Sequence, residues 1–370
     1  MSRNKPYRIV MSGGGTGGHI FPAIAIANGI RAVDPSVDIL FVGATGRMEM
    51  EKVPAAGYPI TGLPVSAFHR GLSLKNLAFP FRLVASMIKA SSVIRKFAPD
   101  LVIGTGGFAS GPVLRVASRK GIPTLVQEQN SFPGVTNRLL ASRVSRICVA
   151  FEGMEKYFPA EKILLTGNPV RSDLLTGTGL RDEGLARFGF TGERPVILVF
   201  GGSQGSRTLN LSLQGKIGML ANQPVDVIWQ TGKTFYPTAV ETVKLSNAEN
   251  VRVMEFIQDM KFAYAAASLV VCRSGAISLS ELALLGKPAI LVPLPSAAEN
   301  HQEKNARTFV DAGAAYLIHD TEAKEKLVDS MLSLVNDRPA LESMSLKMSG
   351  FAKPNAVSDI VTVALNLLTS

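Results

Sequence analysis

The sequence predicts an α/β protein in which two doubly wound parallel sheets follow one another along the chain. Short, continuous apolar runs alternate with helical segments over the whole length, as is typical of parallel strands covered on both faces. The 370 residues suit about two domains. A strand leading into a glycine-rich turn occurs at 7–18 and again at 196–205, so each domain is expected to begin on the same plan.

The strands of both domains are predicted from the positions of the apolar runs. In the first domain they lie at 7–11, 38–42, 101–104, 124–127 and 146–149, and in the second at 196–200, 225–230, 251–255, 269–272 and 289–292. Residues 356–368 carry an apolar stripe at helical spacing and should form a closing helix. We place the first domain at 1–166, the second at 167–345, and a C-terminal segment at 346–370 whose helix packs back towards the first domain.

Composition and charge restrict the class of protein and its partners. Charged residues make up 18% and hydrophobic residues 46%, which indicates a folded globular chain. Arg82 and Lys89 interrupt the most apolar region, and no signal-peptide pattern precedes the first strand, so we expect a cytosolic protein without a membrane span. Cys148 and Cys272 lie in apolar runs without metal-ligand spacing, which predicts buried, reduced thiols.

The positive charge is concentrated in the first half of the chain. Residues 1–166 hold 20 lysines and arginines against 9 acidic residues, whereas the remainder holds 19 against 20. This asymmetry predicts an anionic partner, either a nucleic acid or an anionic membrane surface. The chain lacks an RNA-binding aromatic signature, a helix-turn-helix pattern and a zinc-finger pattern, which disfavours nucleic acid.

The turn at 13–18 has five glycines in six positions, between an apolar strand and an Ala-rich helical segment. Bare main-chain amides and a helix N-terminus predict an anion site there, most simply for phosphate, although a tight turn without a ligand is the alternative. Gly13, Gly15 and Gly18 also satisfy G-x-G-x-x-G. However, the second strand ends in Gly43-Ala44-Thr45 without the carboxylate that a dinucleotide needs, and no Lys-Ser or Lys-Thr completes a P-loop.

Another glycine loop, at 104–112, follows a strand and should therefore lie at the same edge of the first sheet. Two such loops would suit a substrate with two phosphates, while the alternative is that their glycines serve packing. The chain contains no Asp-x-Asp pair for a metal ion, so main-chain donors and side chains are expected to meet the phosphate charge.

In the second domain, the candidates for these donors are the turn around Ser203 and the segment 273–281, where Ser274 and Gly275 open a helix. Glu281, about two turns into that helix, is either a ribose ligand or a solvated helix glutamate.

Seven motifs together resemble one family, the lipid-linked peptidoglycan N-acetylglucosaminyltransferases of glycosyltransferase family 28. They lie at 14–19, at 106–107 with 110–112, and at 128–130, 167–171, 201–205, 273–276 and 299–302 with Asn305. The resemblance implies the GT-B fold, with a cleft between two Rossmann-like domains. It also implies an inverting transfer of N-acetylglucosamine from its UDP conjugate to the C4 hydroxyl of undecaprenyl-diphospho-N-acetylmuramoyl-pentapeptide (lipid I). The product is lipid II for peptidoglycan, which links the activity to the cell wall, cell shape and cell division. No metal or other cofactor is implied.

The resemblance also assigns site residues. Ile257 matches the position whose main chain holds uracil, Glu281 the ribose ligand, and Arg171 with Ser203 the diphosphate contacts. The full set implied for UDP-N-acetylglucosamine is Thr16, Gly17, Gly18, Asn130, Arg171, Ser203, Ile257, Ala276, Ser278, Glu281, Gln302 and Asn305. The acceptor diphosphate is assigned to the two glycine loops, at Gly14, Gly15, Gly106 and Gly107.

His19 ends the first glycine loop and carries the one side chain there that can take a proton near neutral pH. We expect it either to act as general base for the acceptor hydroxyl or to orient the acceptor diphosphate. The alternative is a histidine that only caps the helix.

The segment 68–83 interleaves bulky apolar residues with cations and matches the membrane-facing patch of the family. We expect it to dock the protein peripherally on the cytoplasmic face of the plasma membrane, although an ordinary amphipathic connection is the alternative. The residues assigned to this patch are Leu72, Leu74, Lys75, Phe79, Phe81 and Arg82.

Two other functions are considered, and the first of them shares the two-domain plan. A UDP-N-acetylglucosamine 2-epimerase would use a soluble substrate and would not need the membrane patch. A non-catalytic UDP-sugar-binding scaffold would show no turnover. Release of UDP with and without a lipid-linked acceptor separates the three possibilities.

Overall fold

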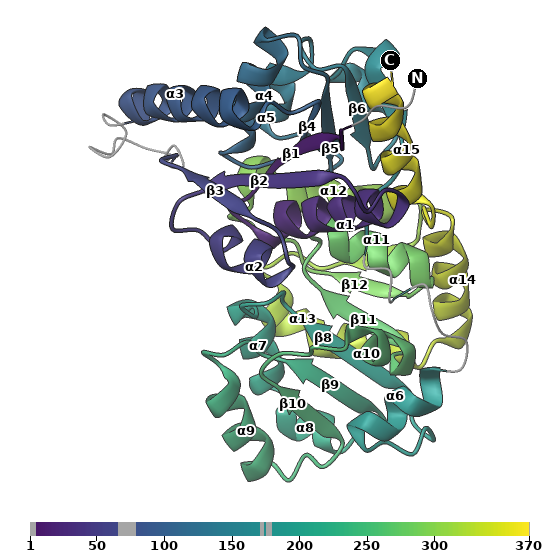
Figure 1. Ribbon diagram of the computed structural model, residues 1–370. Helices are drawn as coiled ribbons and strands as arrows, with labels where there is room; N and C mark the ends of the chain where they lie inside the picture. The colour runs from purple at the N-terminus through teal and green to yellow at the C-terminus, as the bar shows by residue number, and fades with distance from the viewer. Residues whose placement is uncertain (1–4, 66–78, 171–173, 175–179, 370) are drawn as a thin grey trace. The chain divides into compact units, whose positions relative to one another are not determined.

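The computed structural model describes residues 5–65, 79–170, 174 and 180–369. The chain forms two compact units, which we call unit 1 (Met1–Val170 with Pro354–Ser370) and unit 2 (Arg171–Lys353). Each unit contains one parallel sheet flanked by helices (Figure 1). The predicted fold class, two doubly wound Rossmann-like domains, is confirmed. Residues 346–353 stay with unit 2, and the chain returns to unit 1 at Pro354.

Unit 1 has a seven-stranded parallel sheet in the order β3-β2-β1-β4-β5-β6-β7. Its strands are β1 (Arg8–Gly13), β2 (Asp38–Ala44), β3 (Ile60–Leu63), β4 (Leu101–Gly106), β5 (Thr124–Glu128), β6 (Arg146–Val149) and β7 (Ile163–Leu165). The strand order reverses between β1 and β4, and ligands of doubly wound folds bind outside the carboxyl ends of the strands at such a point. Both glycine loops of unit 1 begin there.

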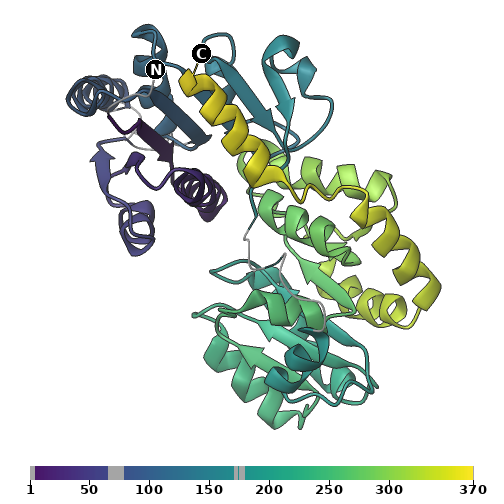
Figure 2. The ribbon, with the colours of Figure 1, turned by 45° about the vertical axis from the view of Figure 1, so that its right-hand side comes forward.

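The helices of unit 1 are α1 (Gly17–Val33), α2 (Glu49–Ala55), α3 (Phe79–Phe97), α4 (Ser110–Arg119), α5 (Val135–Leu140) and α15 (Ala356–Thr369). The C-terminal helix α15, the yellow helix at the C-terminus in Figure 2, packs on α1. Ile360 and Val361 join a buried cluster with Ile26. Gly29 permits this close approach, since a Cβ atom there would lie 2.7 Å from a Val357 methyl carbon.

Unit 2 has a six-stranded parallel sheet in the order β10-β9-β8-β11-β12-β13. Its strands are β8 (Val196–Phe200), β9 (Asp226–Gln230), β10 (Val251–Met254), β11 (Leu269–Cys272), β12 (Ala289–Leu291) and β13 (Ala315–Leu317). Its helices are α6 (Leu180–Phe188), α7 (Arg207–Gln214), α8 (Ile217–Ala221), α9 (Tyr236–Leu245), α10 (Met260–Ala266), α11 (Ala276–Leu285), α12 (His301–Asp311), α13 (Ala323–Val335) and α14 (Arg338–Ser349). The fully buried Trp229 belongs to the core of this unit.

Three strands that the sequence analysis missed, β3, β7 and β13, are all at sheet edges. They are three or four residues long, and part of each is accessible to solvent. An edge strand pairs with one neighbour and is covered less completely, so it lacks the continuous apolar run that marks the central strands.

Both cysteines are buried and free, as predicted. Burial raises the pKa of the Cys148 thiol and of the Cys272 thiol to about 12, so both stay protonated and unreactive at neutral pH. In the part of the chain that the structure describes, none of the helices has the length and hydrophobicity that a bilayer crossing requires.

Candidate functional site

The two glycine loops of unit 1 pack directly on each other. The Gly14 amide donates to the Gly106 carbonyl oxygen at 3.3 Å. Gly107 has a φ of +84°, and a Cβ atom on it would lie 2.1 Å from the Gly14 carbonyl oxygen. Glycine is therefore required at Gly107 both by the left-handed backbone and by the close contact of the loops.

A buried carboxylate supports the first loop from behind. Glu49 of α2 is fully buried, and its Oε2 accepts a hydrogen bond from the Gly15 amide at 3.0 Å while Oε1 accepts from the Ala44 amide at 2.9 Å. The amides of Gly14 and Gly15 are thus engaged within the protein. Since Thr16, the N-cap of α1, makes no side-chain cap hydrogen bond, the first-turn amides of Gly17 and Gly18 are the donors that this loop offers to an anion.

The His19 ring is half-buried and faces a glutamine. Its Nδ1 lies 2.9 Å from Oε1 of Gln129, which follows β5. A Cβ atom on Gly106 would lie 2.9 Å from the same ring nitrogen, so glycine leaves room for the imidazole. The Thr105 hydroxyl donates to the His19 carbonyl oxygen at 2.7 Å. The ring nitrogen Nδ1 is thus engaged by a side chain from another element.

Asn130 is held by the buried residue Glu128. Oε1 of Glu128 accepts from the Asn130 main-chain amide at 3.0 Å and from Asn130 Nδ2 at 3.2 Å. Its other carboxylate oxygen accepts from Asn137 Nδ2 at 2.7 Å. The carboxylate therefore fixes the loop that carries Asn130.

Unit 2 contains a pocket of about 530 Å³ at the carboxyl ends of its strands. Loops that follow β8, β11 and β12 form its wall, and glycines from the turn at 201–205 contribute main chain. The lining residues are Phe200, Gly201, Gly202, Gly205, Ser206, Arg207, Thr208, Arg273, Gly275, Ser278, Leu294, Pro295, Ser296, Gln302 and Asp320.

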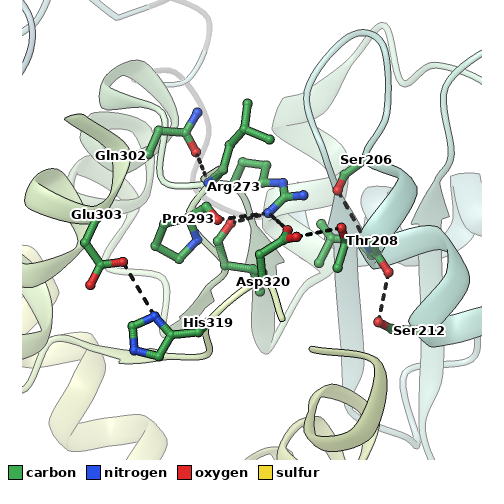
Figure 3. A network of polar contacts seen from close by, with 12 residues as sticks. Ser206, Thr208, Ser212, Arg273, Pro293, Gln302, Glu303, His319 and Asp320 are labelled. Carbon is green, nitrogen blue, oxygen red and sulfur yellow. Dashed lines mark hydrogen bonds and ion pairs between the residues drawn. The ribbon is translucent and has the colours of Figure 1, made fainter. Parts of the chain in front are cut away.

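Two arginines line this pocket, and they differ in their hydrogen bonds and ion pairs. Arg273 Nη1 donates to the carbonyl oxygens of Val292 (3.0 Å) and Pro293 (3.1 Å) and lies 2.5 Å from Asp320 Oδ1. Figure 3 shows Arg273 and Asp320 pointing towards each other, with the Thr208 hydroxyl on the far side of the carboxylate at 3.0 Å. Arg207, by contrast, is exposed and makes no ion pair with any residue in the described part of the chain. Its charge is available to a ligand.

Several predicted donor residues surround the pocket. Ser278 and Gln302 line it, and Gln302 Oε1 accepts from the Leu294 amide at 3.0 Å. Ser203 is exposed in the glycine turn, and Ala276 begins α11. Asn305 is fully buried, and its Nδ2 lies 3.5 Å from the Ser274 carbonyl oxygen. This contact supports the segment before α11. Arg171, Leu72, Leu74 and Lys75 lie outside the described residues.

Ile257 and Glu281 are both tied to residues that the sequence analysis missed. The Ile257 amide donates to Gln230 Oε1 at 2.9 Å, and Gln230 Nε2 donates to the Gly202 carbonyl oxygen at 3.0 Å. Glu281 is 7% exposed and accepts from the Tyr264 hydroxyl at 2.8 Å, so its interpretation as a solvated helix glutamate is wrong.

Other residues of the two sites were also missed by the sequence analysis. Asp320 follows β13, so recognition of that edge strand would have placed a carboxylate at the carboxyl edge of the sheet. No local sequence pattern identified Glu49, Arg207 or Thr208 as residues of a site. Across the described residues, no three His, Cys, Asp or Glu side chains lie close enough together to hold a metal ion.

Two family models match the chain, the glycosyltransferase family 28 N-terminal domain over residues 9–149 and the family 28 C-terminal domain over residues 196–360. Two of the most similar relatives are named UDP-N-acetylglucosamine–N-acetylmuramyl-(pentapeptide) pyrophosphoryl-undecaprenol N-acetylglucosamine transferase. The one from Cytophaga hutchinsonii is 48% identical over 100% of this chain and 99% of its own length. The one from Parabacteroides distasonis is 50% identical over 98% of this chain and 99% of its own.

Solved structures also match the chain over nearly its whole length. The crystal structure of MurG from Acinetobacter baumannii matches with a TM-score of 0.79 and 28% identity, over 98% of this chain and 100% of that one. A UDP-GlcNAc 2-epimerase from Neisseria meningitidis matches with a TM-score of 0.66 at 17% identity, over 98% of this chain and 100% of that one, a likeness of fold alone. The chain belongs to glycosyltransferase family 28 and is a hexosyltransferase of the GT-B fold class, similar along its whole length to the N-acetylglucosamine transferases of that family.

Proposed function

We propose that this enzyme transfers N-acetylglucosamine from UDP-N-acetylglucosamine to the C4 hydroxyl of undecaprenyl-diphospho-N-acetylmuramoyl-pentapeptide, giving lipid II and UDP. The observation that carries the proposal is the identity of about one half to named transferases over both units. In this reaction the acceptor oxygen forms a bond to the anomeric carbon on the face opposite UDP. The bond to the UDP oxygen breaks, and the hydroxyl proton passes to a base. The product carries the transferred sugar in a β linkage, and UDP leaves with the electron pair of the broken bond.

Unit 2 is proposed to bind the donor. The pocket at the carboxyl ends of its strands offers glycine main chain at 201–205, the N-terminus of α11, the Ser278 hydroxyl and the uncompensated charge of Arg207. These groups suit a diphosphate, because amides at helix ends and a guanidinium both stabilise phosphate charge. Glu281 and the main chain of Ile257 are proposed to contact the nucleoside, and Gln302 the sugar.

Unit 1 is proposed to bind the acceptor. The first-turn amides of Gly17 and Gly18 are proposed to meet anionic or polar groups of bound substrate, and His19 is proposed to act on the acceptor hydroxyl. Three glycines contribute through close contacts, because a Cβ atom would meet the Glu49 carboxylate at Gly14, the His19 ring at Gly106 and the Gly14 carbonyl oxygen at Gly107.

The decisive experiment measures UDP release with and without the lipid-linked muramyl acceptor. The proposal predicts release only when the acceptor is present, with appearance of a disaccharide-linked lipid. Formation of UDP with N-acetylmannosamine in the absence of acceptor would instead indicate an epimerase, and no turnover under either condition would indicate a scaffold.

Replacement of Arg207 by glutamine is expected to raise the KM for UDP-N-acetylglucosamine by about tenfold or more, because a charge-assisted contact with the diphosphate is lost. Steady-state kinetics at varied donor concentration measure this effect. Arg338→Gln is the matched control, since Arg338 lies on α14 of the same unit and its ion pair, within the part of the chain that the structure describes, is with Glu342 at the surface. A KM unchanged by Arg207→Gln would contradict the assignment of this charge to the donor.

The start of α3 is proposed to contribute to docking on an anionic membrane on the cytoplasmic side. Phe81, Val84 and Ile88 are 79%, 59% and 66% exposed and lie at helical spacing on one face, with the exposed cations Arg82 and Lys89 beside them. An exposed apolar stripe flanked by cations suits the boundary between headgroups and acyl chains.

The double variant Phe81→Ser with Ile88→Ser is expected to sediment several-fold less with vesicles that contain anionic phospholipid. Leu245→Ser is the matched control, because Leu245 is 77% exposed on α9 of unit 2. Equal sedimentation of the double variant and the control would contradict docking through α3.

A further inference from the structure

Only one of the two orientations of the Gln129 side-chain amide satisfies the hydrogen-bonding groups around it. The side chain is 2% exposed, and Nε2 lies 2.8 Å from the Thr105 carbonyl oxygen and 3.0 Å from the Gln127 carbonyl oxygen. Both of these atoms only accept hydrogen bonds, so the amide nitrogen must face them. The other end of the amide, Oε1, therefore faces His19 Nδ1 at 2.9 Å.

This orientation is locked by a second layer of buried amides. Gln127 Nε2 donates to Asn168 Oδ1 at 2.9 Å, and Asn168 Nδ2 donates to the Gln129 carbonyl oxygen at 3.0 Å. Gln127 and Asn168 are 0% and 2% exposed. Gln127 Oε1 also accepts from Gln129 Nε2. Reversal of the Gln129 amide would set its oxygen against three other acceptors, which a buried network does not tolerate.

The orientation of the Gln129 amide determines which nitrogen of the His19 imidazole carries the hydrogen. Since an amide oxygen can only accept, His19 Nδ1 must carry the hydrogen in this contact. A neutral imidazole protonated at Nδ1 has its lone pair on Nε2. In the neutral ring this lone pair can accept a proton from a hydroxyl, whereas an Nε2–H for a diphosphate exists only when the ring is doubly protonated.

We propose that Gln129 is a positioning residue that fixes neutral His19 in the Nδ1–H tautomer, so that Nε2 is free to serve as the base for the acceptor hydroxyl. This inference rests on the proposed function and supports the general-base role, one of the two roles that the sequence left open for His19. Gln129 itself does not contact the reacting atoms. It acts by selecting which ring nitrogen is free, a role that a buried amide fulfils without adding charge.

The test is ¹⁵N NMR of the full-length protein labelled at histidine, with the His19 signals assigned as those missing from His19→Ala. At a pH where the ring is neutral, the wild type is expected to show a protonated Nδ1 and an unprotonated Nε2. Gln129→Leu keeps a similar volume but cannot accept a hydrogen bond. We expect this variant to shift towards the Nε2–H form and its kcat to fall about tenfold, with the KM for the donor within about twofold.

Thr105→Val is the matched control, because it removes a hydrogen bond to the His19 carbonyl oxygen without touching the ring. Its tautomer signals are expected to match the wild type. A wild-type spectrum with Nε2 protonated would overturn the inference without any variant, as would a Gln129→Leu protein that retains the Nδ1–H form. If the tautomer shifts as expected but His19→Ala keeps full turnover, the tautomer assignment stands and the catalytic role of His19 fails.

Discussion

Replacement of His19 by alanine is expected to lower kcat/KM by about 10²- to 10⁴-fold, the range that one general base contributes. The ring stands at the start of α1, beside both glycine loops, and its Nδ1 is committed to Gln129. Alanine leaves the loops in place because their mutual contacts run through main chain and through Glu49. The measurement is acceptor-dependent UDP release at low concentrations of the lipid-linked substrate.

His319→Ala is the control for this experiment. His319 is also a histidine, is half exposed in unit 2, and lies 3.8 Å from the Glu303 carboxylate (Figure 3). We expect its turnover to stay within about twofold of the wild type, as is usual for surface substitutions. If His19→Ala lowered kcat/KM by less than fivefold, His19 would not be the base in the catalytic step. The proton would then have to pass to another group.

Replacement of Glu49 by alanine is expected to destabilise unit 1 by about 2–5 kcal/mol, because the amides of Gly15 and Ala44 both lose a charged acceptor inside the protein. The single tryptophan, Trp229, lies in unit 2, so its fluorescence follows the unfolding of that unit alone. Hydrogen exchange of the β1 and β2 amides in urea follows unit 1. The variant should lower the urea midpoint for unit 1 and leave the tryptophan transition unchanged.

Glu51→Ala provides the comparison on the same helix. The Glu51 side chain is 78% exposed and, among the described residues, forms its ion pair with the adjacent Lys52 at the surface, so its removal should change stability by less than about 0.5 kcal/mol. If both variants behaved alike, the Glu49 carboxylate would not be the group that holds the first glycine loop.

The central strands and the class of fold were predictable because their signals are local. A strand covered on both faces must be apolar along its length, and a turn in which main chain packs on main chain needs glycine, as at Gly107. The position of His19 directly after a glycine loop made it a candidate for the same reason. These features depend on a few consecutive residues, and they were found from those residues alone.

The partners of the site residues were decided by the tertiary structure. Gln129 lies 110 residues from His19, Glu49 lies 34 residues from Gly15, and Tyr264 lies 17 residues from Glu281. The first two pairs meet because strand order brings their elements to one edge of the sheet, and the third pair meets between the helices α10 and α11. No local pattern indicates which distant side chain will be the partner. The sequence alone determined two parallel sheets, their glycine turns and the candidate base. Which hydrogen-bonding groups are already engaged, and hence which remain for substrate, followed only from the packing of segments distant in sequence, because a hydrogen bond requires its two atoms to lie within about 3 Å.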